Sequence, residues 1–128
     1  MGQQQLLLIV LGVIIVGIAV VVGINVFTAS SSQANRDAVI ADLTNLASLA
    51  QQYYRKPTAL AGGGNTFTGW TIPSVLATTG NGTYTATVSP QTITLVGTGN
   101  EKGNDGTTNV KATMVVAPDK ITSTTINN

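Results

Sequence analysis

The sequence predicts an α+β protein in which a long N-terminal α-helix packs on a small C-terminal antiparallel β-sheet. Three observations support this fold class. Residues 6–24 contain no polar side chain, residues 36–54 carry apolar side chains at helical spacing, and the chain after Pro57 is rich in Thr, Gly and Asn. These patterns are typical of an apolar helix, an amphipathic helix and a set of short strands.

The first segment, residues 6–24, reads LLLIVLGVIIVGIAVVVGI. At about 1.5 Å of rise per residue, such a helix is close in length to the ~30 Å hydrocarbon core of a bilayer. We therefore expect residues 1–28 to form a hydrophobic helix that anchors the chain in a membrane. A cleaved signal peptide is the less favoured interpretation, because signal peptides have a basic start and a shorter apolar stretch.

The helix is expected to continue into an amphipathic half, residues 29–56, because no Pro interrupts positions 25–35. Apolar side chains then recur at intervals of three and four, which predicts one buried face. Arg55, Lys56 and Pro57 predict that the helix ends near residue 55. Arg36, Asp37 and Asp42 are expected on the solvent-exposed side. The side chains predicted to pack against a sheet are Val39, Leu43, Leu46, Ala50 and Tyr53.

Residues 57–128 are expected to form a β-rich part that packs on residues 36–55. Tyr84 and Ala86 alternate with Thr83 and Thr85, which predicts one apolar and one hydroxyl-bearing sheet face. The longest turn region is expected at residues 97–107. The candidate strands are residues 66–72, 83–88, 92–96, 110–116 and 121–126.

Composition excludes several classes of function. Six basic and five acidic residues give a net charge of +1, so we expect no nucleic-acid partner. The chain has no His and no Cys, which removes imidazole bases, thiol nucleophiles and the usual zinc ligands. We therefore expect no enzymatic activity, no catalytic residue, no cofactor and no metal ion.

Two polar segments have alternative interpretations. Residues 100–106 contain oxygen ligands, but they lack the spacing of a calcium loop and are interpreted as a solvated hairpin tip. Asn81 starts an N-glycosylation pattern, yet Asn-Gly is also typical of a tight turn, which we favour. The many Thr residues suit strands and are equally compatible with O-glycosylation.

The order of these segments, from an uncharged N-terminus through an unbroken helix and a Gly-rich loop to a small sheet, resembles the type IV pilins. The resemblance implies that a prepilin peptidase removes a leader, which makes Met1 the first mature residue. It implies insertion in the cytoplasmic membrane, contact with the pilus assembly machinery, and polymerisation of copies into an extracellular filament for adhesion or motility. The residues assigned to subunit assembly are Met1, Gln5, Leu6, Leu7, Ile9, Val10, Val13, Ile14, Val16, Val20 and Ile24.

Two positions depart from the pilin pattern. The family usually has Glu at position 5, where it neutralises a neighbouring amino terminus, and this chain has Gln5. Many bacterial members have Pro at position 22, and this chain has Val22, which predicts an unbroken helix or melting near residues 17–23. Two alternatives are a pseudopilin of a type II secretion-like system and a single-span membrane protein with a small β-rich binding module.

Overall fold

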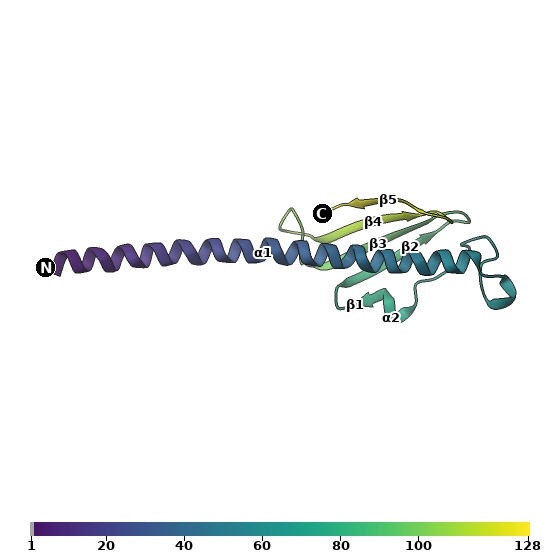
Figure 1. Cartoon of the computed structure of the whole chain (residues 1–128), viewed down its shortest axis with the longest axis horizontal. Helices are drawn as coiled ribbons and strands as arrows, with labels where there is room; N and C mark the ends of the chain where they lie inside the picture. The colour runs from purple at the N-terminus through teal and green to yellow at the C-terminus, as the bar shows by residue number, and fades with distance from the viewer. Residues whose placement is uncertain (1) are drawn as a thin grey trace. The chain divides into compact units, whose positions relative to one another are not determined.

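The computed structural model describes residues 2–128. Helix α1 (Gly2–Arg55) is followed by a 3₁₀ turn η1 (Thr58–Leu60) and a short helix α2 (Ser74–Ala77). The predicted α+β class is confirmed, with the long helix packed on an antiparallel sheet (Figure 1). The chain divides after Ser31 into two compact units. The strands are β1 (Thr78–Thr79), β2 (Gly82–Val88), β3 (Ile93–Lys102), β4 (Asn109–Val116) and β5 (Ile121–Ile126).

In the first unit, residues 2–31 are helical throughout. An 18-residue window of this segment has a mean hydropathy of 3.3 with no part of it buried, so the helix is long and apolar enough to cross a membrane. The Thr28 hydroxyl donates to the Ile24 carbonyl at 3.0 Å, so this polar group is satisfied inside the helix. The helix passes Val22 without a break, which is the first of the two alternatives that the missing Pro leaves open.

In the second unit, residues 32–55 of α1 lie across one face of the sheet (Figure 1). The strands follow one another in the order β1-β2-β3-β4-β5, and every neighbouring pair is antiparallel. The predicted alternation in β2 is confirmed, because Tyr84 is buried while Thr83 and Thr85 are exposed. The core therefore lies between the helix and the inner sheet face. Its sheet side chains are Tyr84, Ile93, Leu95, Ala112, Met114 and Val116.

The predicted strand at residues 66–72 is wrong. The segment is a loop, and its apolar side chains Phe67 and Trp70 are 0% and 7% exposed because they close one end of the core. The Phe67 ring lies 4.9 Å from the Tyr54 ring. Left-handed backbone at Asn65 and at Gly69 turns the chain on both sides of Phe67, which an extended strand does not allow.

The boundary predicted for the third strand is also wrong, because β3 continues through residues 97–102 instead of ending at Val96. Gly97 and Gly99 lie in the strand where α1 approaches it closely. A Cβ atom on Gly97 would come 2.7 Å from Cγ1 of Val39, and one on Gly99 would collide with Oδ1 of Asn35. These glycines serve close packing of helix and sheet rather than a turn. The short elements α2 and β1 have no counterpart among the predicted elements.

Candidate functional site

The residues assigned to assembly all lie on the first half of α1, except that Met1 is outside the described residues. The apolar ones have exposed fractions between 53% for Ile14 and 69% for Leu7. Gln5 is exposed as well. The remaining members of the set, exposed to a similar degree, are Leu6, Ile9, Val10, Val13, Val16, Val20 and Ile24.

The apolar surface of this segment is wider than the assigned set. Leu8, Ile15 and Ile18 are exposed to a similar degree and lie between the assigned residues, so the apolar surface surrounds the helix. Sequence reasoning missed these positions because a run without polar residues has no periodicity to separate a contact face from the rest. A helix that is apolar on all sides is stable only inside lipid or among other apolar helices. We call residues 6–27 the apolar collar.

Three glutamine amides precede the apolar collar. Successive residues of an α-helix point about 100° apart, so Gln3, Gln4 and Gln5 face three different directions. Gln3 lines a shallow apolar groove with Leu6, Leu7 and Val10. Amide groups can both donate and accept hydrogen bonds without carrying charge. A neighbour on any side therefore meets a neutral hydrogen-bonding group at this end of the helix.

The residues predicted to pack against the sheet lie in the second unit. Val39, Leu43 and Ala50 are 0% exposed and Leu46 is 1% exposed, and all four belong to the hydrophobic core. Tyr53 is half-buried at the edge of the core, and its hydroxyl donates to the Thr68 carbonyl at 2.9 Å. This helical face is already covered within one chain, so it is not free to bind a partner.

Polar side chains of α1 form hydrogen bonds with the β1–β2 turn and with the end of β3. Asn35 Nδ2 donates to the Asn81 carbonyl at 2.9 Å, and Asn35 Oδ1 accepts from the backbone N–H groups of Asn100 and Glu101. The Ser32 hydroxyl donates to the Lys102 carbonyl at 2.6 Å. One amide therefore links the β1–β2 turn and the end of β3 to the same turn of helix. We call Ser32, Asn35 and Arg36 the polar clamp.

Arg36 is 7% exposed, which corrects the expectation that it lies on the solvent-exposed side. Its Nη1 donates to Gln33 Oε1 at 2.7 Å and its Nη2 to Asn104 Oδ1 at 2.9 Å. Its Nε has no hydrogen-bond partner within residues 2–128. A guanidinium stays charged in proteins, so it needs acceptors wherever it is buried. Asn104 supplies one from the loop between β3 and β4, which ties that loop to α1.

The expectation that Asp42 lies on the solvent-exposed side is also wrong. Asp42 is half-buried, and its carboxylate faces the sheet. Its Oδ2 accepts hydrogen bonds from the Tyr84 hydroxyl at 2.5 Å and from Thr79 Oγ1 and Asn81 Nδ2 at 3.1 Å each. Burial acts to raise the pKa of Asp42, but these three donors outweigh it and lower the pKa below 3.8. Burial, together with the carboxylate of Asp42, raises the pKa of Tyr84. The cluster stabilises the joint between helix and sheet.

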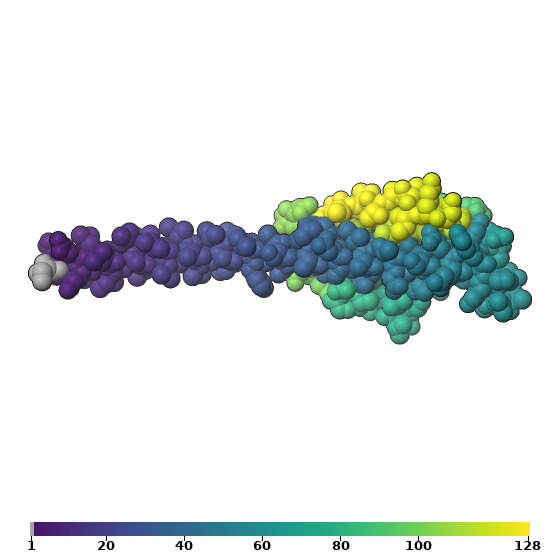
Figure 2. All heavy atoms as spheres, viewed as in Figure 1, coloured from purple at the N-terminus to yellow at the C-terminus, as the bar shows by residue number. Residues whose placement is uncertain are grey.

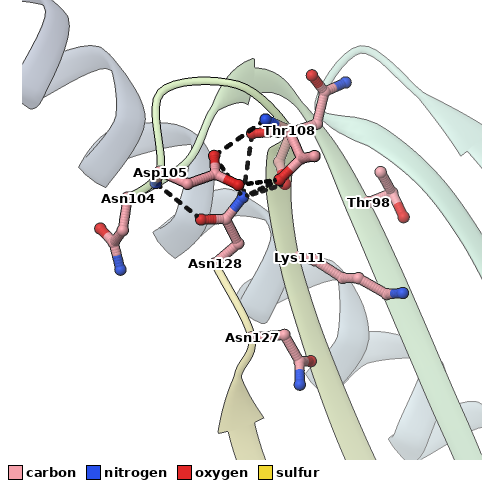
Figure 3. A pocket seen from close by; sticks show the side chains of 8 residues that line it. Thr98, Asn104, Asp105, Thr108, Lys111, Asn127 and Asn128 are labelled. Carbon is pink, nitrogen blue, oxygen red and sulfur yellow. Dashed lines mark hydrogen bonds between the residues drawn. The ribbon is translucent and has the colours of Figure 1, made fainter.

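A hollow of about 720 Å³ lies beside the loop between β3 and β4 (Figure 3). Asp105 occupies this loop, and its carboxylate accepts from the hydroxyl and N–H of Thr108, the N–H of Thr107 and Asn128 Nδ2. The Thr108 hydroxyl is the main cause of the lowered pKa of Asp105, and the backbone N–H groups add to it. The Asp105 carboxylate is thus hydrogen-bonded to residues at the loop itself. This loop is the exposed hairpin tip that the sequence predicts. The lining residues are Thr98, Asn104, Asp105, Thr108, Asn109, Lys111, Asn127 and Asn128.

Comparison with known proteins gives no match: no family model, curated protein or solved structure is significantly similar to this chain. Within residues 2–128, no three His, Cys, Asp or Glu side chains come together as a metal ion would require. The apolar collar is therefore the feature with the clearest functional consequence. It is a large surface that a single chain leaves uncovered.

Proposed function

We propose that the chain is a structural subunit that inserts in the cytoplasmic membrane and then polymerises, through bundled apolar helices, into an extracellular type IV pilus-like filament. One observation carries this proposal. Residues 2–30 of α1 are exposed on every side, while residues 32–55 of the same helix hold the chain's own sheet. The protein thus has a folded part and a separate apolar surface that only other molecules can cover.

Energetic magnitudes favour an assembly over a free subunit in water. Leaving a Leu, Ile or Val side chain exposed costs about 1.5–3 kcal/mol relative to burying it. The apolar collar carries more than ten such side chains. Association costs roughly 4–15 kcal/mol in lost translational and rotational freedom. The free energy gained when neighbouring copies bury the apolar collar is larger than this cost. Lipid fills the same role before assembly.

The charge distribution supports apolar rather than ionic assembly. No ionised side chain occurs before Arg36, and position 5 carries an amide instead of a carboxylate. Gln5 can donate to or accept from a backbone group of a neighbouring copy, which satisfies it without an ion pair. A prepilin peptidase and pilus assembly machinery are the partners that this route requires.

A second candidate is a single-span membrane protein that presents its β-rich unit as a binding module. The observation that favours it is that residues 2–128 contain one helix with the length and hydropathy of a membrane span. The two candidates differ in what covers the apolar collar, which is protein in a filament and lipid in a membrane anchor. A pseudopilin is a variant of the first candidate with a short polymer.

Electron microscopy of material sheared from cells that express the full chain tests the proposal. We expect filaments from the wild type and none from Val13→Asp, because the charge would lie among apolar helices. Val75 is 80% exposed on α2, so Val75→Asp adds the same charge outside the apolar collar and should leave filaments intact. A wild-type chain that stays in the membrane fraction as a monomer would contradict the proposal.

A further inference from the structure

Strand β5 forms one edge of the sheet and is fully exposed. All six residues, Ile121–Ile126, are exposed, and the C-terminal residues lie on the surface of the second unit in yellow (Figure 2). The strand pairs with β4 alone, for example through Thr113 and Thr125 or Met114 and Thr124. Its other side therefore carries a row of backbone N–H and C=O groups that no strand within residues 2–128 pairs with.

The features that usually protect an edge strand are missing from β5. Residues 121–126 read ITSTTI, without a charged residue, a Pro or a Gly. The shift in the β4–β5 register lies at Val115 and Val116, near the start of β5, and leaves residues 123–126 regular. The opposite edge is different, because it is interrupted: the two-residue β1 pairs only with Gly82 and Thr83 of β2, and helix α2 contacts both strands. Uncharged, β-branched edges of this length are templates for pairing with another strand.

The sheet edges of a second copy indicate which of its strands can pair with β5. A second copy of the chain offers two edges, and its opposite edge is interrupted by the two-residue β1 and by α2, which contacts β2. Its β5 can pair through residues 123–126, which are regular. We propose that β5 pairs antiparallel with β5 of a second copy across a two-fold axis, which joins the two sheets into one. The net charge of +1 and the uncharged strand leave little repulsion between the copies.

The symmetry of this contact determines where it can occur. Ser32 bonds to Lys102 near the first end of β4, and Gln51 bonds to the Ala117 carbonyl at its other end, so residues 32–55 run along the strands. A two-fold axis perpendicular to the sheet therefore sets the two helical segments in opposite directions. Subunits of one polar filament point the same way, so the contact would join copies from two filaments. That last consequence rests on the proposed function, whereas the contact itself does not.

The absence of Cys from the chain allows a direct test by disulfide crosslinking. Antiparallel pairing about a two-fold axis at the strand centre sets one residue opposite its own copy. Opposed Cα atoms lie about 4.5–5.5 Å apart, within the range that a disulfide spans. We expect Ser123→Cys or Thr124→Cys to give a disulfide-linked dimer when the detergent-solubilised full chain is oxidised. Thr83→Cys, exposed on β2 and paired with both Thr78 of β1 and Thr98 of β3, should give several-fold less.

Equal dimer yields at the three positions, or no dimer from either β5 variant, would overturn the contact. Thr124→Lys tests its consequence for filaments, with Thr83→Lys as the matched control. We expect Thr124→Lys to form single filaments that no longer associate side by side, while the control still forms paired filaments. Unchanged pairing in Thr124→Lys would also overturn the proposal. If no variant and no wild-type chain forms filaments, the proposed function fails, and crosslinking in detergent still decides whether β5 pairs with β5.

Discussion

The two halves of α1 belong to one continuous helix, yet the chain's own sheet covers the apolar side chains of one half and leaves those of the other half exposed. Residues 32–55 have one apolar stripe, and the chain's own sheet covers it, with Val39 and Leu43 at 0% exposure. Residues 6–24 are apolar on all sides, and residues 2–30 are all exposed. The difference shows that hydropathy alone does not determine how a helix packs, because the arrangement of polar residues around it determines how many neighbours it needs.

The largest expected effect comes from disrupting the packing of residues 32–55 on the sheet. Leu46→Asp places a charge in the core, at a cost on the order of several kcal/mol, which is a large part of the stability of a small domain. Trp70 is the single Trp and is buried in the second unit, so its fluorescence reports unfolding of that unit. We expect Leu46→Asp to lower the thermal midpoint strongly in detergent. Asn45→Asp adds the same charge on the exposed side, and equal midpoints for the two variants would contradict the packing described.

A smaller effect is expected where the helix approaches β3. Gly99→Ala introduces a Cβ atom that collides with Oδ1 of Asn35, so the polar clamp must move. Overpacking of this kind typically costs about 1–3 kcal/mol. Gly80→Ala is the matched control, because a Cβ atom there meets nothing within 4 Å. Urea unfolding followed by Trp70 fluorescence measures both variants. A Gly99→Ala chain as stable as Gly80→Ala would mean that the helix and β3 are not in close contact.

The pH dependence of stability tests the joint between helix and sheet. Folding lowers the pKa of Asp42 below 3.8, so its contribution is complete above that pH and is lost as the pH falls further. Folding raises the pKa of Tyr84, so stability is also lost as the pH rises above 10.0, where the unfolded chain ionises. We expect Asp42→Asn to weaken both dependences of the thermal midpoint. An Asp42→Asn variant with the same acid and alkaline dependence as the wild type would contradict this role. Asp105→Asn serves as control for the alkaline dependence only, because the lowered pKa of Asp105 contributes to the acid dependence as well.

The smallest effect is expected from salt on the uncovered half. Sodium chloride at 1 M screens exposed charges beyond about 3 Å but leaves apolar contacts intact or stronger. Filaments held by the apolar collar should therefore persist at high salt and dissociate in mild detergent. Sedimentation of filaments under the two conditions provides the measurement. Dissociation by salt with resistance to detergent would show that ion pairs hold the copies together.

Much of this fold follows from local patterns. The helix, its end at Arg55 and its buried stripe are visible in the spacing of apolar residues, since a helical period depends on neighbours three and four positions away. Strands β2, β4 and β5 likewise lie close to the predicted ranges. The prediction at residues 66–72 is wrong because Phe67 and Trp70 give the same local pattern whether they belong to a strand or to a loop that closes the core.

The remaining features depend on contacts between distant residues. Gly97 and Gly99 read as turn residues until the position of α1 above them is known. Asn35 and Arg36 read as surface residues, because nothing near them in sequence indicates acceptors or donors some 65 to 70 positions away. Nine residues of the apolar collar are assigned to assembly through the resemblance to type IV pilins, yet no periodicity within the collar distinguishes one face from another. Its contacts are a property of the assembly rather than of one chain.

Chemical labelling of single cysteines in sheared filaments tests the central claim most directly, because the native chain has none. Val13→Cys probes the apolar collar, Leu43→Cys the covered half and Val75→Cys an exposed site on α2. In filaments we expect a maleimide to label only the cysteine at position 75. After dissociation in a mild, non-denaturing detergent, position 13 should become reactive while position 43 stays protected. Equal labelling of positions 13 and 75 in intact filaments would show that the apolar collar is not buried between copies.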